Sequence, residues 1–271
     1  MLKRADLPLL TVDFKPEPEK LIPGSIQHIA RSLTWAEGSL TDEKNPVNQK
    51  KVTNFLDKLP DNSHIPIIGL TGTGGAGKSC LMDELVRSFI TEFPDKMVAI
   101  VSIDPSKRKT GGALLGDRLR MNSIHDRRVY MRSLATRRSN LATSASLDSS
   151  VKLLRASGFD LILVETAGIG QSDSEISDLV DFSIYVMTPE YGAETQLEKI
   201  NMIDFADCIV INKFDKPGAE DALRAVRKQY CRSHLDFDAH PESLPVFGVV
   251  ANRFNDVGTK WFYYKLSLIN I

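Results

Sequence analysis

The chain has 271 residues, of which 42% are hydrophobic and 25% charged. This suits one large globular domain, or one domain with an appendage, around a substantial core. The formal net charge of -1 gives no general attraction to nucleic acid or to an anionic membrane. Three scattered cysteines, Cys80, Cys208 and Cys231, fit neither a disulfide framework nor a zinc site. No apolar run approaches the ~18 residues of a membrane span, and the N-terminus makes a poor signal peptide. We therefore expect a cytoplasmic protein with reduced thiols and with no nucleic-acid or membrane partner.

Two short segments are expected before the main domain. Residues 1–24 contain four prolines among charged residues, which predicts an extended, linker-like lead-in. Residues 25–60 show two amphipathic patterns. The first places Ile29 and Leu33 on one face, and the second begins with Pro46 at the first helical position and places Val52 and Leu56 on one face. We expect a helical N-terminal extension that packs on the main domain.

From residue 61 to residue 256, short apolar runs alternate with helical segments. Six runs, at 65–70, 97–103, 161–165, 182–187, 208–212 and 246–251, are typical of strands buried on both faces. Helices are expected near Lys78 and from Gly218 to Ser233. The alternation predicts a three-layer α/β fold with a mostly parallel central sheet. Residues 257–271 form an atypical, aromatic C-terminal tail.

A phosphate-binding loop is predicted between the first strand of this domain and the helix that follows it. The pattern G-x-x-x-x-G-K-S begins at Gly72 and ends at Ser79. Its glycines let backbone N–H groups point at phosphate oxygens, the helix N-terminus adds a positive dipole end, and Lys78 reaches the outer phosphates. The alternative is a flexible glycine-rich turn. The predicted nucleotide-binding residues here are Gly72, Thr73, Gly74, Gly75, Ala76, Gly77, Lys78, Ser79 and Cys80.

A second motif, N-K-x-D, follows the predicted strand at 208–212 and indicates which base is bound. The Asp215 carboxylate can accept hydrogen bonds from N1–H and the 2-amino group of guanine, whereas adenine offers neither donor there and would leave the carboxylate unpaired. Lys213 can lie along the base, and Asn212 can tie this loop to the phosphate loop. The alternative is a polar turn after a strand. We expect GTP or GDP as the ligand.

Hard oxygen ligands at strand ends predict a magnesium site. The Ser79 hydroxyl, Asp104 after the strand at 97–103 and Glu165 at the end of LILVE meet at the same sheet edge if the strands are parallel. Asp117 is a fourth candidate, with a solvated surface carboxylate as the alternative. Glu165 stands where many GTPases have aspartate.

Two further features concern hydrolysis. Ile169 occupies a position where many small GTPases use glutamine to orient water, and Gln171 is two residues further on. We therefore expect slow intrinsic hydrolysis that a partner or a dimer contact accelerates. Residues 118–138 carry seven arginines, which predicts either a solvated helix face or a surface for an acidic partner. Arg120 is the candidate for a contact with the phosphates.

Four segments together resemble one family. GLTGTGGAGKS, SIDPSKRKTGGALLGDRLRMN, LILVETAGIGQSD and NKFDK are similar to the GTPase chaperones of adenosylcobalamin-dependent acyl-CoA mutases, most of all to the GTPase domain within fused isobutyryl-CoA mutase. The likeness covers residues 23–256. It implies a SIMIBI-type P-loop fold and GTP hydrolysis that gates cobalamin loading and protects the mutase from inactivation. The implied partner is a mutase of the isobutyryl-CoA or methylmalonyl-CoA type.

The resemblance also implies roles for individual residues. It gives Lys78 and Gln171 catalytic roles and makes Arg120 a nucleotide contact. It assigns Ser79, Asp104, Asp117 and Glu165 to magnesium, with the Ile103 carbonyl and Thr166 adjacent. The resemblance implies that adenosylcobalamin is bound by the partner or by domains outside this sequence, and not by this chain.

The chain also departs from the fused members of that family. It has no D-x-H-x-x-G cobalamin motif, no mutase domain and no C-terminal dimerisation arm, which predicts a truncated piece of a fused enzyme that does not itself isomerise acyl-CoA. A homodimer of this chain remains a possible assembly. The alternatives are a nickel-type metallochaperone GTPase, a small-molecule kinase, against which N-K-x-D argues, and a fragment that binds GTP without turnover.

Overall fold

The computed structural model describes residues 14–22, 24–41, 46–60, 62–104, 121–135, 140–166, 176–192, 197, 202–236 and 238–268. Within them, seven strands form one parallel sheet in the order β3-β2-β4-β1-β5-β6-β7. The strands are β1 (Ile67–Gly72), β2 (Val98–Asp104), β3 (Val129–Ala135), β4 (Leu161–Glu165), β5 (Phe182–Met187), β6 (Cys208–Asn212) and β7 (Val246–Val249). The central place of β1 puts the loop that follows it in the middle of the carboxyl edge of the sheet, where ligands bind in open α/β folds.

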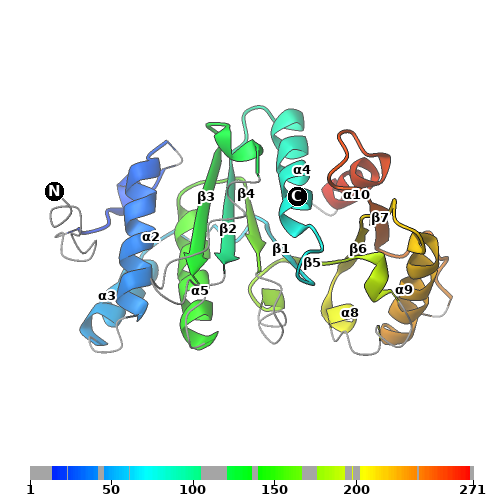
Figure 1. The fold of residues 1–271 in the computed structure, drawn as a ribbon. Helices are drawn as coiled ribbons and strands as arrows, with labels where there is room; N and C mark the ends of the chain where they lie inside the picture. The colour runs from blue at the N-terminus through cyan, green and yellow to red at the C-terminus, as the bar shows by residue number, and fades with distance from the viewer. Residues whose placement is uncertain are drawn as a thin grey trace, which may run out of the picture.

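Helices cover both faces of the sheet, as Figure 1 shows. The helices are α2 (Ile26–Thr41), α3 (Pro46–Leu56), α4 (Lys78–Glu92), α5 (Asn140–Ala156), α8 (Met202–Phe205), α9 (Ala219–Ser233) and α10 (Val257–Ser267). Three 3-10 turns, η1 (Pro18–Lys20), η2 (Ser123–His125) and η3 (Pro189–Tyr191), complete the described elements. Helices α4 and α10 pack on one face, while α2, α5, α8 and α9 pack on the other. The expected three-layer α/β architecture is confirmed.

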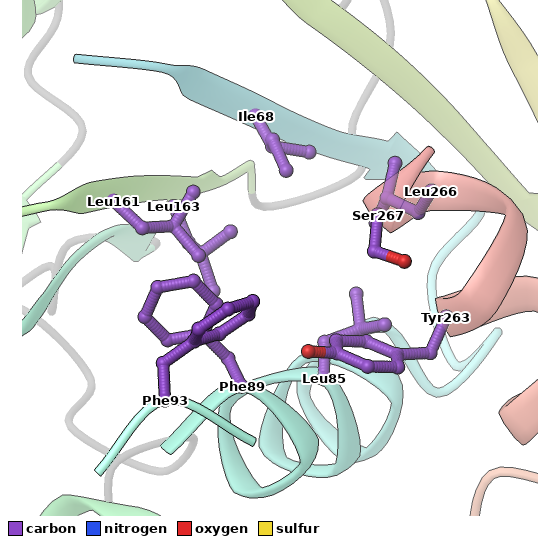
Figure 2. A pocket seen from close by; sticks show the side chains of 9 residues that line it. All are labelled: Ile68, Leu85, Phe89, Phe93, Leu161, Leu163, Tyr263, Leu266 and Ser267. Carbon is purple, nitrogen blue, oxygen red and sulfur yellow. The ribbon is translucent and has the colours of Figure 1, made fainter. Parts of the chain in front are cut away.

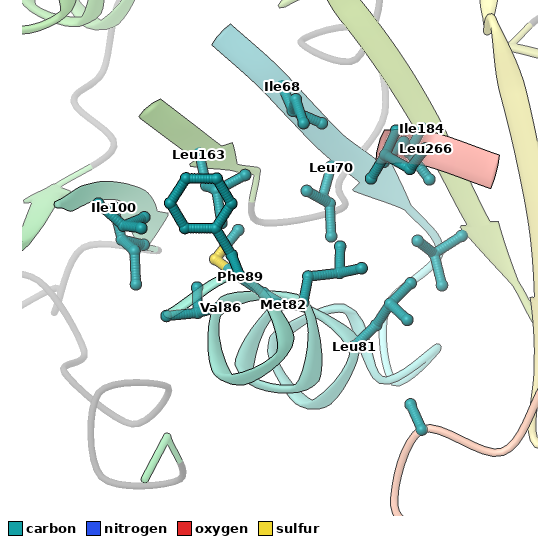
Figure 3. Close-up of a cluster of buried hydrophobic side chains, with 14 of the residues drawn as sticks. Ile68, Leu70, Leu81, Met82, Val86, Phe89, Ile100, Leu163, Ile184 and Leu266 are labelled. Carbon is teal, nitrogen blue, oxygen red and sulfur yellow. The ribbon is translucent and has the colours of Figure 1, made fainter. Parts of the chain in front are cut away.

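The helix after the phosphate loop is fastened to the sheet by its apolar side. Leu81, Met82, Val86 and Phe89 recur at helical spacing and face the sheet, where Leu70 and its neighbours meet them (Figure 3). Each such side chain contributes roughly 1.5–3 kcal/mol when fully buried. The loop between β1 and α4 is therefore held at both ends by a close-packed core.

The N-terminal helices pack on the domain, as expected. Ile29 and Leu33 of α2 are buried in the same cluster as α5 and the strands β2 and β4. The Trp35 ring lies edge-on to Phe55 of α3, with centroids 5.7 Å apart, and the Glu37 carboxylate accepts a 2.7 Å hydrogen bond from Arg132. No helix among the described residues has the length and apolar character needed to cross a membrane.

The structure corrects one expectation. The described part of 118–138, residues 121–135, contains no solvated helix face: it forms η2 and the edge strand β3, which the sequence analysis did not predict. Two of its arginines have structural roles: the Arg128 guanidinium binds the Ile90 and Pro94 carbonyls and Asp126, and Arg132 binds Glu37 of α2. An edge strand needs only one neighbouring strand, so charged residues are tolerated there.

Candidate nucleotide site

The phosphate loop turns through backbone conformations that only glycine adopts without strain. Gly72 has φ 141° and Gly77 has φ 87°, both in the region disfavoured for other residues. A Cβ on Gly72 would lie 1.9 Å from the Val186 carbonyl oxygen, and one on Gly77 would lie 2.4 Å from the Asn212 amide nitrogen. These two glycines let the loop pass close to β5 and β6, while Gly74 and Gly75 face open space.

Lys78 places a buried positive charge inside this loop. Its Nζ donates to the Gly72 carbonyl across 3.0 Å and to the Thr73 carbonyl across 3.3 Å. The residue begins α4, whose N-terminal amides carry the positive end of the helix dipole. Cys80 lies in the same turn, half-buried against the core, so its contribution to an anion would come from its backbone N–H. The arrangement suits a phosphate chain.

Oxygen ligands gather beside the first turn of α4. The Ser79 hydroxyl donates to Glu165 Oε1 across 2.7 Å, and the Ser102 hydroxyl donates to Asp104 Oδ1 across 3.0 Å. Because Ser102 pairs with Glu165 in the parallel register, and Asp104 lies two residues further along β2, all three side chains project to the α4 side of the sheet. Both carboxylates are buried.

This donor set fits Mg²⁺, which prefers oxygen ligands and keeps several waters or phosphate oxygens. Of the remaining sequence candidates, the two that lie among the described residues are placed differently. Ile103 packs its side chain in the cluster on the opposite face, so only its carbonyl is relevant, and the Thr166 hydroxyl donates to the Thr71 hydroxyl across 3.0 Å. No group of three or more His, Cys, Asp or Glu residues able to hold a metal occurs among the described residues.

Asn212 connects the N-K-x-D loop to the phosphate loop, as expected. Its side-chain amide donates to the Ala76 carbonyl across 2.8 Å, while its Oδ1 accepts from the backbone N–H groups of Lys213 and Ala251. Lys213 has φ 58°, and its Nζ donates to the Gly75 carbonyl across 2.8 Å. Two loops that are far apart in sequence thus form one edge of a single site.

Asp215 lies at the open end of this site. Its carboxylate is about half exposed, and Oδ2 lies 3.9 Å from the Arg253 guanidinium. Arg253 belongs to the turn between β7 and α10, and no sequence motif marks that turn. Ser102 was missed, although its position two residues before Asp104 on a strand could have shown that both share a face. The candidates Asp117, Arg120 and Gln171 lie outside the described residues.

The glycine-rich loop follows the central strand of a parallel three-layer α/β sheet, and a lysine and a serine begin the next helix. These features define a P-loop NTPase. The chain belongs to the methylmalonyl-CoA mutase-associated GTPases, because the profile of the family described as "Methylmalonyl Co-A mutase-associated GTPase MeaB" matches residues 29–256. The chain is therefore a GTPase, and the family and fold expected from the sequence are confirmed.

Similar proteins agree with that assignment. A fused isobutyryl-CoA mutase of Geobacillus kaustophilus is 50% identical over 266 residues, which are 98% of this chain and 24% of that protein. The corresponding enzyme of Paraburkholderia xenovorans is 55% identical over 257 residues, 93% of this chain and 19% of that protein. The chain thus spans about a quarter or less of these relatives. The solved structure of a LAO/AO transport system kinase has a TM-score of 0.63 at 24% identity, over 92% of this chain and 72% of that one, and shows the fold alone.

Proposed function

We propose that this GTPase binds GTP with Mg²⁺, hydrolyses it, and thereby gates cofactor loading and protection of an adenosylcobalamin-dependent acyl-CoA mutase. The observation that carries the nucleotide part is the bond between Asn212 and the Ala76 carbonyl. This hydrogen bond holds the N-K-x-D loop beside the phosphate loop, so that one nucleotide can contact both loops. Family membership and the fused relatives support the mutase part.

Each part of the nucleotide has residues suited to it. Phosphate oxygens would take the place of the Gly72 and Thr73 carbonyls as partners of the Lys78 ammonium. The guanine N1–H and 2-amino group would donate to Asp215, whose exposure leaves it accessible. Lys213, held over the phosphate loop by Gly75, would flank the base. An adenine would present no such donors, leaving the carboxylate without a partner.

Mg²⁺ would be held by Ser79, Asp104 and Glu165. The Asp117 carboxylate, the Ile103 carbonyl and Thr166 are further candidates from the sequence. When bound, the ion would neutralise charge on the transferred phosphate. The Ser79 hydroxyl donates to Glu165, and its oxygen would remain available to the ion.

Hydrolysis on the isolated chain is expected to be slow, because Ile169 cannot orient water. We propose that the mutase, as a separate subunit or as the remainder of a longer fused chain, accelerates it, with Arg120 and Gln171 acting at the phosphates. The nickel-chaperone alternative gains no support, because the described residues hold no group of three or more His and Cys side chains placed to bind a metal.

Calorimetric titration with GTP, GDP and ATP, with and without Mg²⁺, tests the nucleotide part. Guanine nucleotides should bind at least ~100-fold more tightly than ATP, a difference of about 2.7 kcal/mol. The Asp215→Asn variant should lose GTP affinity and gain affinity for XTP, because an amide can donate to the xanthine 2-oxo group. Equal binding of ATP and GTP to the unmodified chain would overturn the base assignment.

A turnover assay tests the proposed GTP hydrolysis and its acceleration by the mutase. Phosphate release from GTP should be slow for the chain alone and should rise when a purified isobutyryl-CoA mutase holoenzyme is added. Tight GTP binding with no turnover in either condition would instead identify a GTP-binding module without hydrolysis, the remaining alternative.

A further inference from the structure

Helix α10 lies beyond residue 256, where the family profile ends, and one of its faces is apolar and exposed. Its inner face is buried through Thr259, Phe262 and Leu266. Its outer face carries Val257, Trp261, Tyr264 and Leu268, which are 81%, 52%, 52% and 60% exposed. The spacing of four, three and four residues aligns these side chains on one side of the helix. We call these four residues the α10 stripe.

The stripe is unusual for the surface of this molecule. Eleven large apolar side chains are exposed among the described residues, and four of them form the stripe, with a fifth, Phe254, just before it. Single exposed apolar side chains are ordinary on protein surfaces, but a contiguous exposed apolar patch indicates a binding site for another molecule. Trp and Tyr are also the residue types that contribute most to binding at protein interfaces.

The aromatic residues of the stripe are already ordered. The rings of Trp261 and Tyr264 stack, with centroids 5.8 Å apart and planes 26° apart. The Lys265 ammonium lies 4.7 Å from the centroid of the Trp261 ring. Because these contacts restrict the side chains before any partner arrives, less entropy is lost on binding.

A cavity of about 350 Å³ opens beside the end of the stripe. Phe182 and Cys208, which begin β5 and β6, line it together with Leu268. These strand starts lie at the amino edge of the sheet, opposite the nucleotide. A partner can therefore insert an apolar side chain there without covering the nucleotide site. The rest of the lining is Glu242, Ser243, Leu244, Pro245, Phe247, Phe262, Lys265 and Leu266.

Charge narrows the chemistry of the partner. Helix α10 carries Lys260 and Lys265 and no acidic residue. A surface that complements it would be apolar at its centre and acidic at its rim. A second copy of α10 packed on the first would bring lysines against lysines, which disfavours pairing of the helix with itself, although Glu242 also lines the cavity.

Two sets of contacts join α10 to the nucleotide loops. The Tyr263 hydroxyl donates to Glu92 at the end of α4 across 2.6 Å, and Tyr263 and Leu266 line a small cavity with Leu85 and Phe89 of α4 (Figure 2). Helix α4 begins at Lys78 in the phosphate loop.

The second connection runs through the N-cap of α10. Asp256 accepts hydrogen bonds from Thr259 and from the Val250 N–H, and the neighbouring Ala251 N–H donates to Asn212. The stripe is thus mounted on the two segments that would hold the nucleotide.

From these observations we infer that the α10 stripe and its cavity are the docking surface for the acyl-CoA mutase, through an apolar, acid-rimmed patch on the mutase. This rests on the proposed function. The fused relatives support it, because their matched regions include nearly all of this chain, α10 among it, within a polypeptide about four times as long. In such a polypeptide this region is tethered to the remainder of the chain, which favours contact between the two.

Binding of the full chain, saturated with a nonhydrolysable GTP analogue, to a purified isobutyryl-CoA mutase holoenzyme tests the inference. The double variant Trp261→Ser/Tyr264→Ser should bind at least ~10-fold more weakly. The variant Lys260→Glu should also bind more weakly and should reduce the sensitivity of binding to salt. The matched control Val47→Ser, which removes an exposed apolar side chain from α3 on the opposite face, should change affinity by less than ~2-fold. GTP affinity and thermal melting should be the same in all variants, which excludes unfolding.

Three outcomes would overturn the inference. The mutase binding the double variant as well as the unmodified chain would place the interface elsewhere while leaving the proposed function intact. Self-association that the double variant abolishes would make the stripe a contact between copies. No mutase binding and no stimulation of hydrolysis with the unmodified chain would overturn the proposed function together with the inference.

Discussion

The Asn212 side chain donates a hydrogen bond to the Ala76 carbonyl across 2.8 Å, although 136 residues separate them. The same side chain accepts from Lys213 and Ala251, so one buried amide serves three segments. Such an amide is costly to remove, because each backbone group that it satisfies would be left buried without a partner.

Replacing Asn212 with alanine should therefore weaken both the fold and the site. We expect a loss of about 2–3 kcal/mol in the free energy of unfolding, measured by urea denaturation, and a fall in GTP affinity of at least ~10-fold in calorimetry. The exposed neighbour Asn252 provides the control, since Asn252→Ala should stay within about 0.5 kcal/mol. Unchanged GTP affinity in Asn212→Ala would show that the two loops act independently.

Two glycines of the phosphate loop should respond very differently to alanine. Gly72→Ala forces a Cβ to within 1.9 Å of the Val186 carbonyl oxygen at a φ of 141°, which should cost about 3 kcal/mol or more. Gly74→Ala meets nothing within 4 Å and should change unfolding free energy by less than about 1 kcal/mol. Urea denaturation of both variants measures the difference. Equal stabilities would contradict the described course of the loop.

Glu165→Gln should separate magnesium binding from nucleotide binding. The variant keeps an acceptor for the Ser79 hydroxyl but loses the negative charge that would face the ion. We expect the enhancement of GTP affinity by Mg²⁺ to fall at least ~10-fold, with little change in GDP affinity measured in EDTA. The exposed carboxylate Asp57 supplies the charge control as Asp57→Asn. An undiminished Mg²⁺ effect would remove Glu165 from the metal site.

Asp126 should make stability depend on pH at the acid end. Hydrogen bonds from the Arg128 side chain and backbone lower the pKa of Asp126 from 3.8 to about 2. Because the pKa is lower in the folded state, the stabilisation is present above about pH 4 and is lost as pH falls toward 2. After allowance for solvent screening, it amounts to about 1 kcal/mol.

Asp126→Asn should therefore be less stable than the unmodified chain by about 1 kcal/mol at pH 6, and the gap should narrow from about pH 4 and vanish as pH falls through about 2. Urea denaturation across this range measures it. A gap that is constant with pH would assign the effect to packing or neutral hydrogen bonding rather than to the charge of Asp126.

The phosphate loop, six of the strands and the position of Asn212 could be predicted from the sequence, because each depends on local residue patterns. The glycines, Lys78 and Ser79 form a contiguous loop with a recognisable phosphate-binding pattern. Six short apolar runs are typical of strands in a covered parallel sheet, and all six form strands. The tie between Asn212 and the phosphate loop could be predicted too, because the carboxyl ends of parallel strands share one edge.

The sequence by itself determined the nucleotide-binding class and the family, because those depend on residue types at short spacings. The tertiary structure alone decided three further matters: that the arginine-rich 121–135 becomes an edge strand, that Arg253 approaches Asp215, and that α10 buries Phe262 while exposing Trp261. The physical reason is common to all three. Edge pairing, loop approach and the choice of a buried helix face depend on partners distant in the chain, and no local pattern of residues specifies those partners.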